Sequence, residues 1–212
     1  SGWTSYANLG YRNQIVLDAM QEQMNRFCHM DYNIWGSRML EELAELLVSR
    51  APEGLDKVYF SGTSGSEAIE AAMKLSFHVH HDSGKPTKTN YIFREHSFSG
   101  ATLQAMTVSD LPILNFYNPI KPNNTAIIPE HNALHHKRND ETIDEYARRG
   151  ARDLEDKILE LGPDNICAFV GETMLGSLRG DVPPAPEYWK YIRKVCDKYD
   201  VHIILDEIYC GS

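Results

Sequence analysis

Short apolar segments of strand length alternate with helical segments along most of this 212-residue chain. Apolar runs occur at 90–94, 166–170 and 201–205, and the helical segment 187–199 leads directly into the last of them. Strands that alternate with helices are typical of parallel strands joined by helical crossovers. The pattern predicts an α/β fold, with a mostly parallel sheet and helices on both of its faces.

The first third of the chain predicts two helices before any strand. Apolar residues at helical spacing indicate helices at 15–27 and 37–48, with Ser37 as the N-cap of the second. We expect a short strand at 57–60, followed by a helix at 67–80.

The middle of the chain lacks a clear period. Residues 109–140 are rich in Pro and Asn, so we expect a long surface loop, and loops of this length are often functional. A charged helix is expected at 140–161. In terms of domains, residues 1–50 are expected to lead into a large domain formed by 51–212.

Composition disfavours several classes of partner. The net charge is −9 and no run of Lys or Arg exceeds a pair, which argues against binding to nucleic acid. No apolar run approaches the ~20 residues of a membrane helix, so we expect no membrane partner. The cysteines are widely spaced without paired ligand spacing, which disfavours a zinc site and favours reduced thiols and a cytoplasmic location. They are Cys28, Cys167, Cys196 and Cys210.

A turn of small residues, Ser64-Gly65-Ser66, precedes the helix at 67–80. Free N–H groups at a helix N-terminus, with hydroxyls beside them, form an anion site that suits a phosphate. An ordinary serine N-cap with a glycine turn is an equally good interpretation of this segment alone. The glycines do not have the spacing of a dinucleotide fingerprint or of a Walker loop.

Three more side chains are expected at the same edge of the sheet. Phe98 lies in the loop after the strand at 90–94, and Glu172 and Asp206 follow two later strands. Taken alone, a loop phenylalanine more often packs in a core, and acids are common where strands end. Together with an anion site, they suit a flat, phosphorylated, cationic ring, and pyridoxal phosphate has these properties.

Five blocks of the sequence resemble class III aminotransferases, which are fold type I pyridoxal phosphate enzymes. Residues 60–74 resemble the family signature F-x-x-S-G-S-E-A-x-E-A-A-x-K, and residues 8–11 resemble its N-L-G-H segment. Residues 98–100 resemble an aromatic-His-Gly block, 171–184 an E-P…P-P block, and 205–208 the D-E-V block. The blocks occur in the family's order across almost the whole chain.

The resemblance implies roles for the residues that match. Gly65 and Ser66, with Ser64 beside them, would hold the phosphate of the cofactor. Phe98 would stack on one face of the ring and Ile208 would pack on the other. Asp206 would pair with the pyridine nitrogen, which keeps that nitrogen protonated.

Further roles follow from the same resemblance. Glu172 would lie near the ring and support the site, and we group it with Asp206 as a catalytic residue. Ser99, which replaces a family histidine, would be a further cofactor contact. Trp3 falls near the substrate-pocket aromatics of the family, although packing in a core is an equally good interpretation.

Several positions depart from the family pattern. Thr173 replaces a proline, and Tyr209 replaces a glutamine that contacts the ring hydroxyl of the cofactor. Ser177 stands where members that use glutamate often carry an acid, which argues against specificity for 2-oxoglutarate. The segment 115–138 resembles a subfamily insertion, and its histidines are expected to be solvated rather than to bind a metal. They are His131, His135 and His136.

The family binds its cofactor covalently through a Schiff-base lysine that lies beyond the D-E-V block. Lys74 and Lys190 lie on helical segments unsuited to this role, and the sequence continues only to Ser212. We therefore expect the chain to be an N-terminal and central part of a longer protein, catalytically incomplete by itself.

The resemblance implies that the parent protein is an aminotransferase that works as a homodimer. It would transfer an amino group from an amino donor to a keto acid or an aldehyde. A racemase, aminomutase or decarboxylase of the same fold is the alternative within this class of enzymes. A non-catalytic fragment that only binds phosphate is the alternative from another class.

Overall fold

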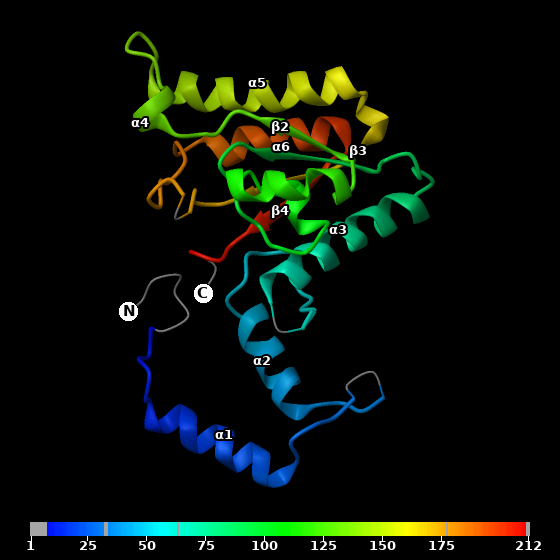
Figure 1. Ribbon diagram of the computed structural model, residues 1–212, viewed down its shortest axis with the longest axis vertical. Helices are drawn as coiled ribbons and strands as arrows, with labels where there is room; N and C mark the ends of the chain where they lie inside the picture. Colours follow the sequence, from blue (N-terminus) through cyan, green and yellow to red (C-terminus); the bar gives the residue numbers. More distant parts are fainter. Residues whose placement is uncertain (1–7, 32–33, 63, 177, 211–212) are drawn as a thin grey trace. The chain divides into compact units, whose positions relative to one another are not determined.

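The computed structural model describes residues 8–31, 34–62, 64–176 and 178–210 of the chain (Figure 1). These residues form two compact units, Ser1–Phe60 and Ser61–Ser212, which are described separately. None of the described helices is both long enough and apolar enough to cross a membrane.

The first unit contains the two expected helices, α1 (Gln14–Arg26) and α2 (Arg38–Val48). The side chain of Asn13 caps α1 and that of Ser37 caps α2, each by accepting a hydrogen bond from the first turn. No residue of either helix is buried. The apolar side chains of this unit therefore do not form a core of their own.

The expected strand at 57–60 is not formed. These residues have no regular secondary structure, and Tyr59 is 70% exposed. A strand is stabilised by pairing with a neighbour, and within the described structure this segment pairs with no strand. The prediction relied on local β-propensity, which tertiary context overrides.

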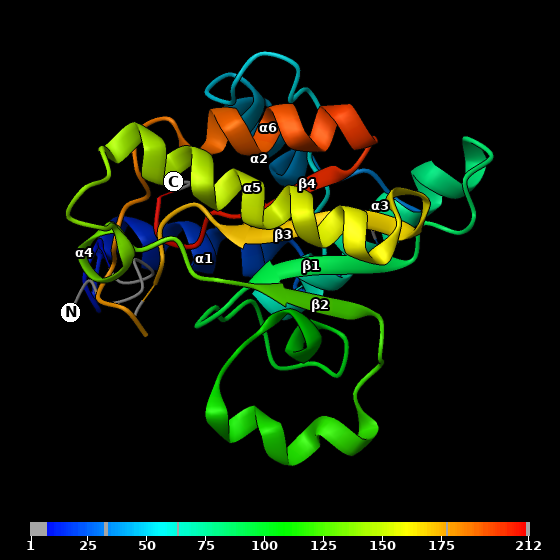
Figure 2. The ribbon, with the colours of Figure 1, turned by 90° about the horizontal axis from the view of Figure 1, so that it is seen from above.

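The second unit is built on a parallel sheet of four strands, in the order β2-β1-β3-β4 (Figure 2). The strands are β1 (Asn90–Arg94), β2 (Thr125–Ile128), β3 (Ile166–Glu172) and β4 (His202–Asp206). All three neighbouring pairs are parallel. This confirms the predicted fold class and three of its predicted strands.

Helices cover both faces of this sheet. On one face, α5 (Ile143–Leu161) and α6 (Tyr188–Tyr199) pack against Ile92 and Phe169 (Figure 2). On the other face, α3 (Gly65–Asp82) packs against strand residues that include Tyr91, Phe93 and Val170. Burial on both faces explains why the central strands are mostly apolar, with β3 fully buried.

The segment 109–140 is more regular than expected. It contains the edge strand β2, the 3-10 helix η2 (Pro112–Ile120) and the short helix α4 (Ala133–His136). A further 3-10 helix, η1 (Ala105–Val108), precedes it and packs on β1 and α3. The expectation of an unstructured loop was therefore wrong, because a strand of four residues is too short to show a period.

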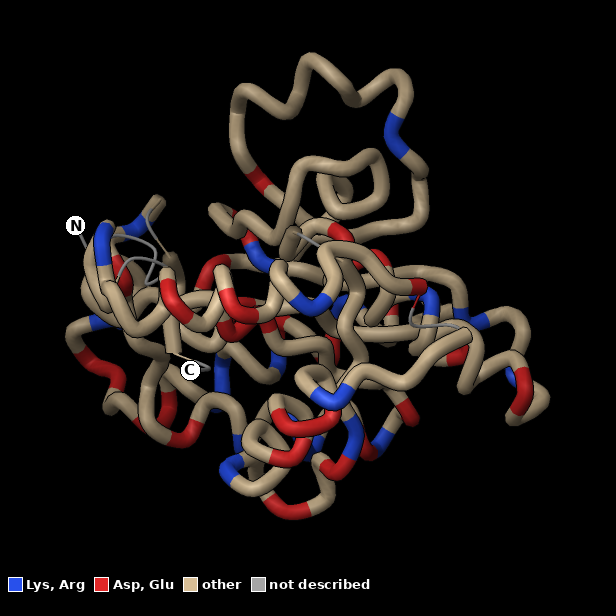
Figure 3. The backbone as a smooth tube through the Cα atoms, turned by 90° about the horizontal axis from the view of Figure 1, so that it is seen from below, with Lys and Arg blue, Asp and Glu red and all other residues tan. Residues whose placement is uncertain are grey.

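Charged residues are unevenly distributed along the second unit. Figure 3 shows acidic and basic residues interspersed over most of the described chain, whereas the segment 101–124 carries only Asp110 and Lys121. In that segment Ile113 and Phe116 of η2 are exposed. The segment around η2 thus exposes apolar side chains and carries few charges.

At the amino-terminal edge of the sheet, the ammonium group of Lys88 is buried among backbone carbonyls. Its Nζ donates to the oxygens of Pro163, Ile166 and Tyr199 at 2.9, 3.1 and 3.1 Å. It joins the short 3-10 helix η3 (Pro163–Asn165), the start of β3 and the end of α6. Helix C-termini carry a partial negative charge, which suits a cation at this place.

Candidate functional site

The N-terminus of α3 is fixed by a capping box. The hydroxyl of Ser64 accepts the N–H of Glu67 at 3.4 Å, and the carboxylate of Glu67 accepts the N–H of Ser64 at 2.9 Å. Ser64 is therefore the N-cap of the helix, and it does not belong to the lining of the pocket described next. The positive end of the helix dipole and the N–H groups of the first turn remain directed at that pocket.

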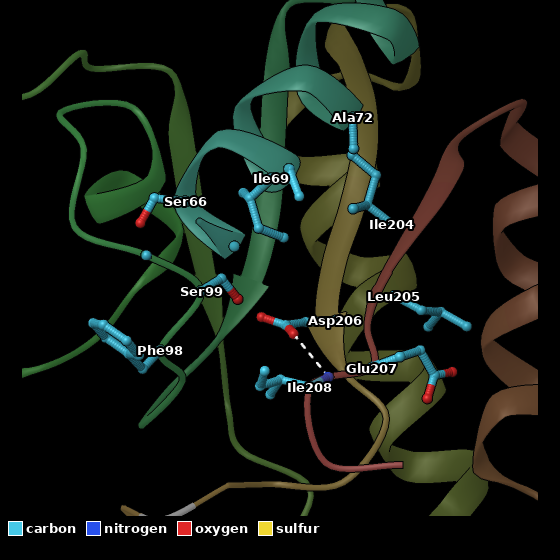
Figure 4. Close-up of a pocket in the computed structure, with 13 residues that line it drawn as sticks. Ser66, Ile69, Ala72, Phe98, Ser99, Ile204, Leu205, Asp206, Glu207 and Ile208 are labelled. Atoms are coloured by element: carbon cyan, nitrogen blue, oxygen red, sulfur yellow. Dashed lines mark hydrogen bonds between the residues drawn. The ribbon is translucent and has the colours of Figure 1, made fainter. Parts of the chain in front are cut away.

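A pocket of about 550 Å³ lies at the carboxyl edge of the sheet (Figure 4). Its size is within the usual range for sites of small ligands and cofactors. It is formed by the first turns of α3, the loop after β1 and the end of β4. Its lining includes Gly65, Ser66, Phe98, Ser99, Asp206 and Ile208. The structure thus brings together six of the residues that the sequence singled out.

The loop after β1 is held against the start of α3. The hydroxyl of Ser66 accepts the N–H of Ala101 at 2.9 Å. Between them Gly100 has a φ of +144°, and a Cβ added there would lie 2.8 Å from the Ser66 hydroxyl and 2.7 Å from the Cβ of Ala105. Only glycine fits this backbone and this close approach.

Ser99 connects this loop to the end of β4. Its N–H donates to the hydroxyl of Ser109 at 2.9 Å, and its side chain points toward Asp206 in Figure 4. A hydrogen bond from the Ser99 side chain to Asp206 lowers the pKa of that carboxyl. A serine thus occupies the position of the family's histidine and reaches the acid of the site.

Asp206 is the last residue of β4 and faces into the pocket. Burial raises the pKa of its carboxyl above the ordinary value. Hydrogen bonds from the N–H of Ile208, at 3.3 Å, and from Ser99 lower the pKa. No cationic side chain in the described part of the chain forms an ion pair with it. A half-buried carboxylate without a cation is stabilised if a ligand brings one.

Glu172, expected to lie near the ring and support the site, contacts the backbone of two loops of the site. Its side chain is buried, and its carboxylate accepts the N–H groups of Phe98 at 2.9 Å and of Gly176 at 2.8 Å. It is not part of the pocket lining. Glu172 therefore supports the site through the backbone of two loops, and the structure gives it no contact with the pocket itself.

Phe98 and Ile208 are exposed apolar members of the site, with 43% and 53% of their surfaces accessible. Both line the pocket, one from the loop after β1 and the other from the turn after β4. They offer apolar surface next to a carboxylate and a helix N-terminus, as a flat ring with an anionic substituent would require.

Two residues that the sequence analysis did not single out help to build the site. Ser109 accepts the N–H of Ser99 and donates toward the carbonyl of Ala105, at 3.1 Å. Arg94, at the end of β1, is buried and donates to the carbonyl oxygen of Glu172. An arginine inside an apolar strand was a signal that could have been used, because buried charges are rare unless they have a partner.

The expectation of solvated histidines was wrong for His131. Its ring is stacked between those of Tyr146 and Tyr188, with centroids 4.3 and 3.9 Å away, and burial lowers its pKa to about 3. His136 bonds Glu130 at 2.7 Å. Among the described residues, no three potential ligands gather as a metal ion would require.

Two positions of interest cannot be placed in this arrangement. Trp3, a predicted substrate-pocket residue, and Ser177, where an acid would favour glutamate, both lie outside the described residues.

The pocket matches the chemistry of pyridoxal phosphate in its donor set. A helix N-terminus with glycine and serine suits the phosphate, and apolar side chains suit the faces of the ring. Asp206, which has no cationic partner among the described residues, suits a protonated pyridine nitrogen.

Comparisons with known proteins agree with this chemistry. The chain matches the family described as aminotransferase class-III over residues 1–212. It is 36% identical over 212 residues to an uncharacterized aminotransferase of Schizosaccharomyces pombe, covering all of this chain and 46% of that protein. It is 31% identical to gamma aminobutyrate transaminase 2 of Solanum lycopersicum, covering 96% of this chain and 44% of that protein.

A solved structure shows the same fold. The omega transaminase from Pseudomonas jessenii, in complex with PMP, superposes with a TM-score of 0.89 at 33% identity, covering 96% of this chain and 45% of that one. The chain thus spans less than half the length of these relatives. Class III aminotransferases use pyridoxal phosphate, and by its match over the whole sequence this chain belongs to the class III aminotransferase family.

Proposed function

We propose that the protein containing this chain is a pyridoxal phosphate-dependent aminotransferase and that the pocket beside Asp206 is part of its cofactor site. The observation that carries the proposal is the half-buried carboxylate of Asp206, which has no cationic partner in the described structure and lies in one pocket with the N-terminus of α3. Membership of the family supports it.

Each end of the pocket would hold one part of the cofactor. The N–H groups at Gly65 and Ser66 would bind the phosphate, helped by the dipole of α3. The carboxylate of Asp206 would accept a hydrogen bond from the pyridine N–H. Phe98 and Ile208 would cover the ring with apolar surface.

The chemistry that pyridoxal phosphate supplies when bound is an electron sink for the pair left at Cα when one of its bonds breaks. The protein contributes by keeping a proton on the pyridine nitrogen. Asp206 does this as an anion, and pairing with a cation would lower the pKa that burial raises. Ser99 donates to Asp206 and so orients its carboxylate.

The amine that reacts with the cofactor is proposed to come from outside residues 1–212. No lysine lines the pocket in the part of the chain that the structure describes. Lys74 lies on α3, and Lys190 on α6 bonds Glu187 at 2.7 Å. The family resemblance supports a lysine that follows the D-E-V block.

We propose an amino donor and a keto acid or aldehyde acceptor as substrates. The names of relatives, which include a gamma aminobutyrate transaminase, support an amino donor of this general kind. A homodimer is supported by the family resemblance, and a cytoplasmic location by the free thiols of the four cysteines.

A single-turnover reaction of the full-length protein tests the proposed activity. The protein, loaded with pyridoxal phosphate and free of acceptor, is mixed with an amino donor, and the keto product is quantified. We expect about one keto product per bound cofactor, because a transaminase retains the amino group until an acceptor arrives. Bound cofactor without keto product from any of a panel of amino donors would contradict the proposal and favour a racemase, aminomutase or decarboxylase.

A further inference from the structure

A buried arginine lies behind the candidate cofactor site. Arg94 is the last residue of β1, and its side chain is 1% exposed. Its guanidinium lies over the rings of Tyr188 and Trp189 of α6, with centroids 5.7 and 5.4 Å away. Such contacts are favourable for a desolvated cation but do not neutralise its charge. No carboxylate side chain in the described structure forms an ion pair with Arg94.

The guanidinium also donates a hydrogen bond to Glu172. A terminal N–H of Arg94 donates to the carbonyl oxygen of Glu172, at the end of the adjacent strand β3. Nε of Arg94 has no partner within the described part of the chain. A cation held this close to Glu172 acts on the carboxylate of the same residue through a medium from which water is excluded.

The carboxylate of Glu172 links two loops by hydrogen bonds, and we call this arrangement the clamp. One oxygen accepts the N–H of Phe98 and the other accepts the N–H of Gly176, so both oxygens are used as acceptors. A Cβ at Gly176 would lie 2.6 Å from Glu172 Oε2, which shows how closely the second loop approaches. The bond to the N–H of Phe98 fixes the backbone at this residue, whose side chain is proposed to cover the cofactor ring.

This clamp is strongest when Glu172 is ionised. Both N–H groups then donate to a charged acceptor, whereas protonation turns one oxygen into a hydroxyl that donates and accepts more weakly. Burial raises the pKa of Glu172, and Asp206 adds to the rise. The N–H groups of Phe98 and Gly176 and the charge of Arg94 lower it.

The other titratable groups around Arg94 do not compensate its charge. His131 stacks on Tyr188, and its pKa is lowered by burial and then by the charge of Arg94, so its ring is neutral. Burial raises the pKa of Tyr188, so its phenol is also neutral at neutral pH. Asp153 acts on Tyr188 from α5 but forms no ion pair with Arg94. Glu172 is thus the carboxylate that benefits from this cation.

We propose that Arg94 is a positioning residue that acts through the Glu172 carboxylate to hold Phe98 in place at the pocket. The proposal rests on the proposed function, because Phe98 matters to the cofactor only if the pocket binds pyridoxal phosphate. The link from Arg94 through Glu172 to the Phe98 backbone can be tested without the cofactor.

The test compares variants of the full-length protein by two readouts. Protection factors of the Phe98 and Gly176 amides are measured by hydrogen exchange in cofactor-free protein, and the affinity for pyridoxal phosphate is measured between pH 6 and 8. The variants are Arg94→Met, Arg94→Lys, Glu172→Gln and the double variant Arg94→Met/Glu172→Gln. Lys88→Met is the matched control, because it removes another buried cation bonded to backbone carbonyls, at the opposite edge of the sheet.

For Arg94→Met we expect the protection factors of the Phe98 and Gly176 amides to be about tenfold lower than in Lys88→Met. A change of this size corresponds to the weakening of one hydrogen bond to a charged group. The affinity should fall more steeply toward pH 6 than in the unmodified protein, because loss of the cation raises the pKa of Glu172. Arg94→Lys should restore part of both effects. Glu172→Gln should reproduce the loss of protection, and the double variant should lose the added pH dependence.

Equal protection in Arg94→Met and Lys88→Met would overturn the proposal, as would an added pH dependence that persists in the double variant. If Arg94→Met does not fold, normal protection of Phe98 in Glu172→Gln overturns it instead. Failure of the proposed function would look different. The unmodified protein would then bind no pyridoxal phosphate, while the protection factors would still respond to Arg94 and Glu172.

Discussion

At the scale of single residues, the pocket depends on a close contact that leaves no room for a side chain at Gly100. Its φ of +144° is unfavourable for other residues, and an added Cβ would meet Ser66 and Ala105. We expect Gly100→Ala to lower the free energy of unfolding by roughly 2 to 3 kcal/mol and to weaken cofactor binding. Chemical denaturation and titration with pyridoxal phosphate measure both quantities.

Gly84 provides the matched control for this prediction. Its φ is +77°, but nothing lies within 4 Å of an added Cβ. Gly84→Ala should therefore cost only about 1 kcal/mol, from the backbone alone, and leave cofactor affinity unchanged. Equal losses in the two variants would show that the contact with Ser66 is unimportant.

We expect the carboxylate of Asp206 to lower the stability of the cofactor-free protein at neutral pH and to strengthen cofactor binding. Burial raises its pKa in the folded protein, so the folded state binds this proton more tightly than the unfolded chain does. Its contribution to stability is therefore greatest below the unfolded pKa of about 4, and it is lost as pH rises through the raised folded value. Asp206→Asn should make the cofactor-free protein more stable at pH 7 and less dependent on pH, while weakening cofactor binding. Thermal unfolding between pH 4 and 8 checks this, and a less stable variant at pH 7 would contradict it.

The sequence predicts the residues that touch the pocket better than the residues that position them. Gly65, Ser66 and Asp206 occur in short motifs next to strand or helix ends, where spacing alone indicates an edge of the sheet. Arg94 and Ser109 act through contacts between segments that are distant in the sequence, and no local pattern indicates such contacts.

At the scale of elements, the capping of α3 fixes the anion-binding end of the pocket. Ser64→Ala removes the acceptor for the N–H of Glu67 and should cost about 1 kcal/mol of stability. It should also weaken phosphate binding, because fraying of the first turn moves the N–H groups of Gly65 and Ser66. Pyridoxal phosphate and inorganic phosphate affinities measure this second effect.

The capping box of α5 is the control for this element. The Thr142 hydroxyl accepts the N–H of Glu145 at 3.2 Å, and this helix does not line the pocket. Thr142→Ala should have a similar cost in stability and no effect on either affinity. Equal affinities for pyridoxal phosphate and inorganic phosphate in the Ser64 and Thr142 variants would show that the cap of α3 does not contribute to binding.

Elements with a clear period or a continuous apolar run were predicted, and the edge strand β2 was not. The helices α3, α5 and α6 bury one face each, so their apolar residues recur at helical spacing. β2 has four residues at the edge of the sheet, within a segment rich in Pro and Asn. Its place is fixed by pairing with β1 rather than by its own sequence.

At the scale of the whole molecule, the pocket combines parts that are far apart in the chain. The start of α3, the loop after β1 and the end of β4 meet at the carboxyl edge of one parallel sheet, where such folds place their ligands. The chain spans less than half the length of its relatives. The central claim therefore concerns the full-length protein, and it is that Asp206 keeps a proton on the cofactor ring.

The ¹⁵N chemical shift of the pyridine nitrogen tests this claim most directly. Full-length protein is loaded with pyridoxal phosphate labelled at that nitrogen, and the spectrum is recorded across pH 6 to 9 for the unmodified protein and for Asp206→Asn. We predict the shift of a protonated nitrogen at every pH in the unmodified protein, and of an unprotonated nitrogen in the variant. An unprotonated nitrogen in the unmodified protein, or the same shift in both, would contradict the account.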